Sequence, residues 1–380
     1  MTHSAPFTPV YQVGENLWNI QDLLGRFDEP AFLSDGVHRI SDLHLQPGRE
    51  AHYRFDGELV PLPQGAVLDS QTVLKLLEPI LNEKAREQVQ AGHDLDASWE
   101  WAERQLAFRI NIFIAREGVC AAIRVLASNV PPPEELGFPM ERNWQDIVNL
   151  EQGLVIVTGV TGSGKSTTVA SLIRRRARDR GERVITLEDP IEYVLEGDRA
   201  LISQRELGTH LETFSGGLRS ALREDPDVIF VGEIRDPETA ALALTAAETG
   251  HVVITTMHTR DARGAVTRLV DIFPLNRSHE VCSQISFSLH SVIAQKLVPR
   301  ADGQGRRAAM EVMANHPSIG NLIRTGKWAQ IPGALETQRR NGCITLDQHL
   351  KQLVEDGSVD IEVALRFANS GSLQAMLSGE

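Results

Sequence analysis

Cysteine is scarce in this chain of 380 residues, which contains Cys120, Cys282 and Cys343 and no others. The three lie far apart and form no C-x-x-C pair, which excludes a zinc ribbon and a disulfide framework. Few cysteines without a pairing pattern are typical of proteins from a reducing compartment. We therefore predict a cytoplasmic protein.

Long apolar runs and an excess of basic residues are missing as well. Residues 1–6 have neither the basic nor the apolar segment of a signal peptide, and no run reaches the length of a membrane-spanning helix. The net charge is −13, whereas general nucleic-acid binders are usually basic. The sequence therefore predicts no nucleic-acid partner and only peripheral membrane contact, made through another protein.

The most informative stretch is the glycine-rich segment 159–167, which has the G-x-x-x-x-G-K-S spacing of a phosphate-binding loop (P-loop). An apolar run, 153–158, precedes it and a helical pattern follows it. The N–H groups of such a loop and the dipole of the following helix attract anionic oxygens. A glycine-rich turn that matches by chance is the alternative, and it fits this strand–loop–helix context less well.

The residue types in this segment have chemical reasons. Glycine permits backbone angles and close approaches that a Cβ would block. Lys165 places a positive charge on the β- and γ-phosphates, and the Ser166 hydroxyl can bind Mg²⁺. The predicted ligands are therefore ATP and Mg²⁺. The predicted nucleotide-binding residues of the loop are Gly159, Thr161, Gly162, Ser163, Gly164, Lys165, Ser166 and Thr167.

Composition and periodicity divide the chain into regions of an α/β protein. Three consecutive prolines after Val130 predict a semi-rigid linker. Apolar strands alternate with amphipathic helices after the linker, which predicts a RecA-like core with a mostly parallel sheet. The residues before the linker contain strand patterns, a hairpin signal at Asp56-Gly57 and a helical segment. This combination predicts a small mixed α/β domain. The predicted regions are an N-terminal extension (1–36, either a short helix or a mobile tail), an N-terminal α/β domain (37–129), the linker (130–135), the RecA-like core (136–290) and a C-terminal helical subdomain with a tail (291–380).

Acidic residues follow two predicted strands, at the edge where open α/β sheets bind their ligands. Glu233 follows the apolar strand 228–231, which predicts a Walker B acid that acts on Mg²⁺ or on the attacking water. Glu188, Asp189 and Glu192 follow another strand and are costly to hold together unless a cation or a proton is shared. Solvated surface carboxylates are the alternative for both groups, but the nearby P-loop favours the functional interpretation.

Other candidates come from histidine and arginine. His258 ends the predicted strand 252–257 and is placed to contact the γ-phosphate, although a lone histidine is more often structural. His251 begins the same strand, too far from His258 for a shared metal ion if the strand is straight. Arg109 and Arg124 lie on two adjacent predicted strands, and arginine suits bidentate contacts with phosphate. Solvated surface positions are the alternative for both arginines.

Together these segments resemble the type IV pilus retraction ATPases (PilT-like) of the type II/IV secretion ATPase superfamily. The resemblance covers residues 37 to 370, most of the chain. The C-terminal signature of that family usually has Glu where this chain has Thr325. The matching segments are 41–45 and 109–111 (the N-terminal, PAS-like domain), 159–167 (Walker A), 186–193 (Asp box), 228–236 (Walker B), 250–259 (His box) and 321–327 (the C-terminal signature).

The resemblance implies a homohexameric ring that hydrolyses ATP to drive pilus retraction and twitching motility. It implies catalytic roles for Glu192 and Glu233, and it implies that Arg109 and Arg124 approach the phosphates of a nucleotide bound between the two domains. It further implies an inner-membrane platform protein of the pilus as partner, and therefore a location at the inner face of the cytoplasmic membrane. A second retraction ATPase is a further expected partner if the role is accessory.

Several related functions remain open at this stage. Assembly and secretion ATPases usually carry a long N-terminal region and a four-cysteine metal module, neither of which appears in this sequence, and this favours retraction. The residues before Val37 fit an accessory retraction ATPase (PilU-like) or a secretion-linked relative comparably well. A nucleic-acid translocase is disfavoured by the net charge, and a non-catalytic subunit is disfavoured by the intact Lys165, Glu192 and Glu233.

Overall fold

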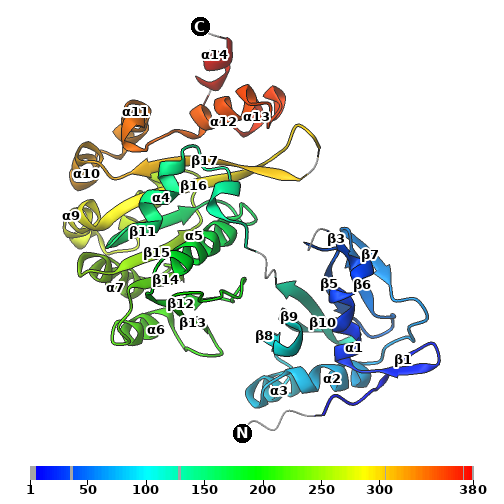
Figure 1. Cartoon of the computed structure of the whole chain (residues 1–380). Coiled ribbons are helices and arrows are strands. Elements are labelled where there is room, and N and C mark those ends of the chain that lie inside the picture. Colours follow the sequence, from blue (N-terminus) through cyan, green and yellow to red (C-terminus); the bar gives the residue numbers. More distant parts are fainter. Residues whose placement is uncertain (1–5, 35–36, 127–129, 304, 371, 379–380) are drawn as a thin grey trace. The chain divides into compact units, whose positions relative to one another are not determined.

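The computed structural model of the chain describes residues 6–34, 37–126, 130–303, 305–370 and 372–378. The chain divides into two compact units, coloured blue to cyan and green to red in Figure 1. The N-terminal unit comprises the residues up to 129 together with the segment Pro190–Val194, and the C-terminal unit comprises the rest. Helices and sheets in both units confirm the predicted α/β class.

The N-terminal unit is built on a six-stranded sheet in which every neighbouring pair is antiparallel. Asp56 and Gly57 have φ angles of 48° and 91° and form the two-residue turn of the predicted hairpin. In spatial order the strands are β7 (Glu58–Pro61), β6 (His52–Phe55), β5 (Ile40–Leu45), β10 (Gly118–Leu126), β9 (Leu106–Ala115) and β8 (Leu95–Trp101).

Smaller elements complete this unit. Helix α2 begins at an N-cap, Asp69, whose side chain accepts a hydrogen bond from the Thr72 N–H. The additional elements are β1 (Tyr11–Val13), β2 (Asn16–Trp18), β3 (Leu33–Ser34), β4 (Val37–His38), α1 (Ile20–Gly25), α2 (Ser70–Leu77) and α3 (Glu83–Gln90).

The predicted start of the first domain at Val37 is wrong, because the segment before it belongs to the same core. Tyr11 is buried and its hydroxyl donates a hydrogen bond to the carbonyl of Ala66. Phe27 is fully buried, with its ring 5.5 Å from that of Phe108 in an edge-on arrangement. The short helix predicted near residues 20–27 is present as α1, and its apolar side chains explain why this segment packs.

The C-terminal unit contains a seven-stranded sheet. All its strands are parallel except the last, β17, which pairs with β16 in an antiparallel manner. In spatial order the strands are β13 (Leu201–Glu206), β12 (Arg183–Glu188), β14 (Val228–Glu233), β15 (Val252–Met257), β11 (Gly153–Thr158), β16 (Leu289–Pro299) and β17 (Arg306–Ala314).

Helices cover both faces of this sheet, as expected for parallel strands. Residues of α6 to α11 pack in one apolar cluster, and residues of α4 and α5 pack in another. The helices are α4 (Glu141–Val148), α5 (Lys165–Asp179), α6 (Phe214–Ala221), α7 (Pro237–Glu248), α8 (Ala262–Asp271), α9 (Ser278–Ser288), α10 (Pro317–Arg324), α11 (Ile331–Thr337), α12 (Leu346–Glu355), α13 (Ile361–Phe367) and α14 (Ser372–Ser378).

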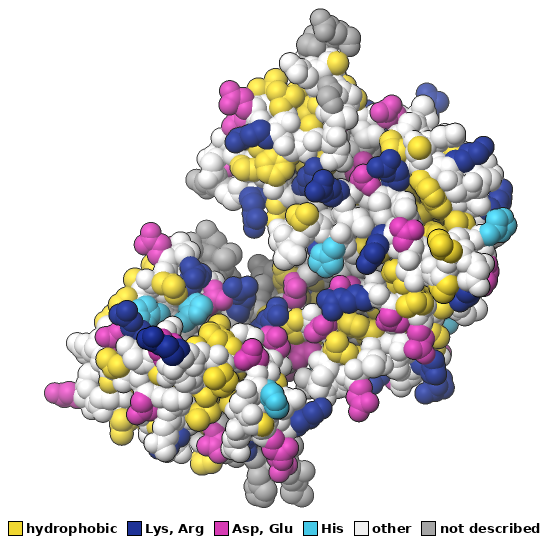
Figure 2. Space-filling model, turned by 180° about the vertical axis from the view of Figure 1, so that it is seen from behind, with side chains coloured by type: hydrophobic (Ala, Val, Ile, Leu, Met, Phe, Trp, Pro, Cys, Tyr) yellow, Lys and Arg dark blue, Asp and Glu magenta, His cyan; other side chains and the backbone are white. Residues whose placement is uncertain are grey.

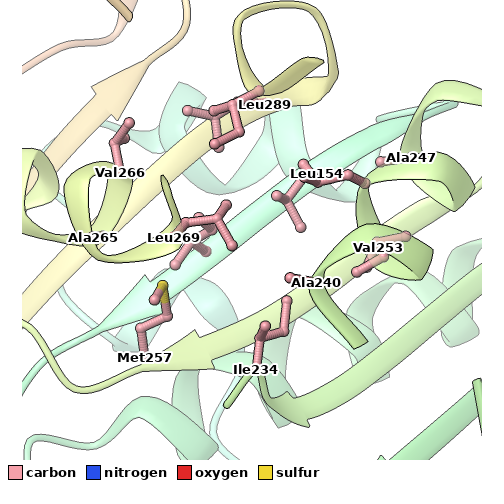
Figure 3. Packing of buried hydrophobic residues seen from close by; sticks show 14 of the residues in the cluster. Leu154, Ile234, Ala240, Ala247, Val253, Met257, Ala265, Val266, Leu269 and Leu289 are labelled. Atoms are coloured by element: carbon pink, nitrogen blue, oxygen red, sulfur yellow. The ribbon is translucent and has the colours of Figure 1, made fainter. Parts of the chain in front are cut away.

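The larger cluster lies beneath the strands that carry the predicted site. Leu154 of β11 and Val253 of β15 meet Ala240 of α7 and Leu269 of α8, and each of these residues is fully buried (Figure 3). Removing a buried leucine side chain from such a cluster costs about 2–5 kcal/mol. The ends of these strands are therefore held in fixed positions relative to one another.

Two further predicted boundaries need correction. Residues 130–135, predicted as a semi-rigid linker, belong to the C-terminal unit: the Ser171 hydroxyl of α5 donates to the carbonyl of Pro131, and Arg175 is ion-paired with Glu134. The helical subdomain does not begin at residue 291, because β16 and β17 extend the central sheet to Ala314. These two largely buried strands form an antiparallel pair where a helical region was predicted. Helices α4 and α9 were also not predicted.

Candidate nucleotide-binding site

The P-loop connects β11 to α5 and has the backbone geometry expected of it. Gly159, Gly162 and Gly164 have φ angles of 152°, 76° and 87°. A Cβ on Gly159 would lie 2.5 Å from the carbonyl oxygen of Gln295, so this position requires glycine for space as well as for its backbone angle. The glycine pattern of the sequence thus corresponds to a tight turn against β16.

Lys165 begins α5 and is 8% exposed. Its ammonium group donates hydrogen bonds to the carbonyl oxygens of Gly159, at 2.9 Å, and Val160, at 3.2 Å. The charge is therefore held over the loop. Thr161 is exposed, whereas the buried Ser163 hydroxyl has no hydrogen-bond partner among the described residues. Ser166 and Thr167 are half-buried in the first turn of α5.

Two sets of hydrogen bonds flank the loop, and no sequence motif indicated either of them. On the β15 side, the buried Thr158 hydroxyl lies 3.1 Å from the carbonyl oxygens of Met257 and Thr259 and accepts from the Thr259 N–H at 2.9 Å. On the β16 side, the buried side-chain amide of Gln295 binds the loop. Thr158 was visible only as the last residue of an apolar strand, and Gln295 lay beyond the predicted core.

Glu233 lies at the carboxyl end of β14, where the register with β15 shifts. Its side chain is 16% exposed and is ion-paired with Arg235. The His258 Nε2 atom lies 3.7 Å from one of its carboxylate oxygens. The structure therefore brings together two of the predicted catalytic side chains, Glu233 and His258, at the ends of adjacent strands.

Electrostatics favour a neutral His258. Partial burial is the largest influence and lowers its pKa, and the positive charges of Lys165 and Arg235 lower that pKa further. The carboxylate of Glu233 opposes these effects. The neutral form of the ring is therefore favoured, and in that form it can both donate and accept a hydrogen bond. The pairing of β11 with β15, which sets Thr158 opposite Met257, places the start of the P-loop beside the His258 segment.

The acidic residues after β12 occupy different environments. Glu188 is buried and accepts hydrogen bonds from the Thr186 hydroxyl at 2.6 Å and from the Gln204 side chain at 2.9 Å. Glu192 belongs to the segment that groups with the N-terminal unit. The predicted catalytic role of Glu192 therefore stays a prediction. The hydrogen bonds of Glu188 fix the carboxyl end of β12.

Arg109 and Arg124 lie directly opposite each other on β9 and β10. Arg109 is 3.7 Å from Asp96, and the Arg124 side chain donates to the buried Asp42 at 2.7 Å. Their side chains are 39% and 64% exposed. The predicted adjacency is confirmed, and their approach to a phosphate stays a prediction.

A cavity of about 230 Å³ adjoins the P-loop and is lined by basic and apolar side chains. Lys296, next to Gln295, donates to the carbonyl of Phe367 at 2.9 Å and to the Asn369 side chain at 2.7 Å. Burial lowers the pKa of Lys296, while Asp347 raises it. The side chains of the cavity from outside the loop are Arg260, Gln295, Lys296, Leu297, Arg306 and Phe367.

The start of α8, directly after His258, is fixed by two carboxylates. Asp261 accepts from the Gly264 N–H at 2.6 Å, and the buried Glu311 of β17 accepts from the Ala262 N–H at 2.8 Å. Burial raises the pKa of Glu311. These bonds tie the His258 segment to β17, a connection that no sequence motif indicated.

Only a limited set of metal ligands is available. In the part of the chain that the structure describes, no group of three or more His, Cys, Asp or Glu side chains could hold a metal ion. Mg²⁺ usually binds one or two protein oxygens together with substrate phosphates. The Ser166 hydroxyl and the Glu233 carboxylate are donors of this kind, so the residues present fit a nucleotide-bound Mg²⁺.

Comparison with known proteins defines the class. Residues 34–366 match the family described as type II/IV secretion system protein. The chain therefore belongs to this family, as the motifs predicted.

Individual relatives show which members of the family this chain resembles in sequence and fold. The chain is 44% identical over 321 residues to the uncharacterised protein YggR of Escherichia coli, covering 84% of this chain and 96% of the relative. It is 43% identical over 326 residues to the type IV pilus retraction ATPase PilT of Pseudomonas aeruginosa, covering 85% and 93%. A crystal structure of the pilus retraction motor PilT with bound ADP superposes with a TM-score of 0.83 at 37% identity, covering 93% of this chain and 98% of that one. Within its family, this chain is a PilT-like ATPase.

Proposed function

We propose that this protein is an ATP-hydrolysing motor that drives type IV pilus retraction and so supports twitching motility. The observation that carries the proposal is the convergence of Lys165, Glu233 and His258 in one unit of a chain that is 43% identical to PilT. Glu233 ends β14 and His258 directly follows β15, at the sheet edge where open α/β sheets bind ligands, and the loop that leads to Lys165 begins at the same end of β11.

The P-loop binds the phosphates of ATP through its N–H groups and through Lys165. The ammonium group exchanges the carbonyl oxygens of Gly159 and Val160 for phosphate oxygens, which carry more charge. The adjoining cavity, with Phe367, Leu297 and basic side chains, accommodates the remainder of the nucleotide. Gly159, Gly162 and Gly164 keep the backbone close enough for these contacts.

Ser166 and Glu233 would hold the Mg²⁺ ion that neutralises charge on the β- and γ-phosphates. Glu233 also lies where it can orient the attacking water or accept its proton, at the end of β14. Neutral His258 then offers a ring N–H to a γ-phosphate oxygen. ATP binding and hydrolysis are thus divided between the loop and the ends of the neighbouring strands.

The N-terminal unit supplies the remaining charges in this proposal. Glu192 completes the acidic set, and Arg109 and Arg124 stabilise charge on the phosphates, a role that arginines brought in from outside commonly have in phosphoryl transfer. The motor in this proposal is a homohexameric ring. The ring acts on an inner-membrane platform protein of the pilus at the inner face of the cytoplasmic membrane. A second retraction ATPase is a further proposed partner.

Among the described residues no helix is both long and apolar enough to span a membrane. Acidic and basic side chains are intermixed over the molecular face in Figure 2. Such a surface offers no continuous basic stripe to a nucleic-acid backbone on this face, and nucleic-acid translocation is the less favoured function.

Gene deletion tests the proposal. Loss of a retraction motor abolishes twitching but leaves surface pili, whereas loss of an assembly ATPase removes the pili. An unchanged twitching rate with a second retraction ATPase still present would indicate the accessory role. ATPase rate measured against oligomer size, with and without DNA, tests the chemistry separately. Hydrolysis only in the ring fraction is expected, and strong stimulation by DNA would overturn the proposal.

A further inference from the structure

Gln295 lies beside the P-loop on β16, the strand that pairs with β11 on the side away from β15. Its side chain is 2% exposed, and its backbone carbonyl is the group that a Cβ on Gly159 would strike. The preceding residue, Ala294, pairs with Thr158 at the end of β11. Gln295 is therefore in register with the first residue of the loop.

Both ends of the Gln295 amide are used. Its Nε2 donates to the carbonyl oxygen of Ser163 at 2.6 Å, and its Oε1 accepts from the Thr168 hydroxyl at 2.9 Å. The orientation of the amide follows from chemistry, because the Ser163 carbonyl can only accept. One buried side chain thus connects the loop to the first turns of α5.

The bond to Ser163 also determines the direction of an N–H group. A peptide unit is planar and trans, so the carbonyl of Ser163 and the N–H of Gly164 point in opposite directions. Holding the carbonyl towards Gln295 turns that N–H away from β16. Gly164 N–H belongs to the set that a P-loop presents to phosphate. Rotation of this peptide would replace a donor with an acceptor facing the nucleotide.

We propose that Gln295 is a positioning residue that keeps the P-loop in its phosphate-binding conformation. It touches no reacting atom and acts through the Ser163–Gly164 peptide and through Thr168. The inference rests on the ATP site proposed above and adds a residue outside the P-loop and Walker B segments that sets nucleotide affinity.

The test compares Gln295→Met with wild type, because methionine fills a similar volume without donating or accepting these bonds. We expect the Kd for a fluorescent ADP analogue and the KM for ATP to rise about tenfold, as for a buried hydrogen bond worth about 1.4 kcal/mol, while kcat changes less than threefold. Gln348→Met is the matched control, because the side-chain amide of Gln348 likewise binds a backbone group, as the acceptor from the Thr345 N–H at the start of α12. It should lower Tm and leave both constants unchanged.

Two further variants keep the test informative if Gln295→Met does not fold. Thr168→Val removes the hydroxyl bound by Gln295 at nearly constant volume and should weaken ADP binding, whereas Thr168→Ser keeps the hydroxyl and should restore it. If Gln295→Met and Thr168→Val lower Tm but leave KM and Kd within twofold of wild type, the residue has only a structural role. A wild-type protein that binds ADP without hydrolysing ATP would refute the motor function and still test the role of Gln295 through Kd.

Discussion

The P-loop and the acidic strand ends beside it are held in place by different forces. Apart from the Lys165 ammonium, the loop is fixed by its own glycine backbone and by the neutral amide of Gln295, and Thr158 before it makes neutral hydrogen bonds to the Met257–Thr259 segment. Glu233 instead is surrounded by charge and by a titratable ring, in Arg235 and His258. Neutral bonds fix a shape, whereas exposed or half-buried charges can exchange partners when a ligand of opposite charge arrives.

This difference separates binding from chemistry. Nucleotide affinity should depend on the loop and on the strand β16 behind it. Turnover should depend on groups from β14 and β15. Substitutions in the two regions should therefore change different constants.

Lys165→Ala should have the largest effect, because Lys165 belongs to both functions. It contacts the loop and also lowers the pKa of His258. Removing a cation that stabilises the transferring phosphoryl group costs two to three orders of magnitude, so we expect kcat/KM to fall about 10³-fold. Weaker ADP binding should accompany this fall. Lys351→Ala, at an ion pair within α12, is the control for charge, and wild-type activity of Lys165→Ala would contradict the assignment.

Glu233→Gln should reduce turnover and spare binding. The amide keeps the shape of the side chain but neither accepts a proton nor neutralises a cation, so kcat should fall about 10²-fold or more. ADP affinity should remain within about threefold of wild type. Glu238→Gln on α7, whose carboxylate pairs with the exposed Arg219, is the matched control. Hydrolysis by Glu233→Gln at the wild-type rate would refute the role of this residue.

Thr158→Val should lower turnover, whereas Gln295→Met weakens nucleotide binding. It leaves the Thr259 N–H without its acceptor, at a cost of about 1–3 kcal/mol, and loosens the segment that carries His258. We expect kcat to fall about tenfold while KM changes little, and Thr158→Ser to recover most of the loss. Equal effects of Thr158→Val and Gln295→Met on KM would contradict the hypothesis that the β16 side of the loop sets nucleotide binding and the β15 side sets turnover.

The loss of folding stability in acid should arise at His349 of α12, outside the P-loop and outside the strand ends that carry Glu233 and His258. Burial lowers its pKa to about 4, and its Nδ1 accepts from the Met310 N–H. Because the unfolded state takes up a proton near pH 6.5 and the folded state only near 4, stability is lost as the pH falls between these values, by about 2 kcal/mol at pH 5.

His349→Asn keeps an acceptor for Met310 and removes the titration. Urea unfolding at pH 7 and pH 5 should therefore show a shallower pH dependence for this variant than for wild type. The exposed His279 provides the control, since His279→Asn should leave the pH dependence unchanged. A slope that His349→Asn does not alter would assign the acid sensitivity to other groups.

Local sequence predicted those parts of the molecule that depend on local physics. The glycines of 159–164, the apolar run before them and the acid after strand 228–231 indicated the loop, the sheet and Glu233, because a P-loop and a buried strand are each encoded within about ten residues. The hairpin at Asp56-Gly57 was predictable for the same reason. The family followed from the order of these segments.

Tertiary structure decided what lies next to the loop. Gln295 follows Ser163 by more than a hundred residues, and only the pairing of β16 with β11 brings its amide to that carbonyl. The same holds for the packing of Tyr11 and Phe27 into the first unit and for Glu311 at the start of α8. Hydrogen bonds and burial between distant segments leave no periodic signal in the sequence. The chain alone therefore determined the chemistry of the P-loop, and the fold determined which neutral groups hold that loop in shape.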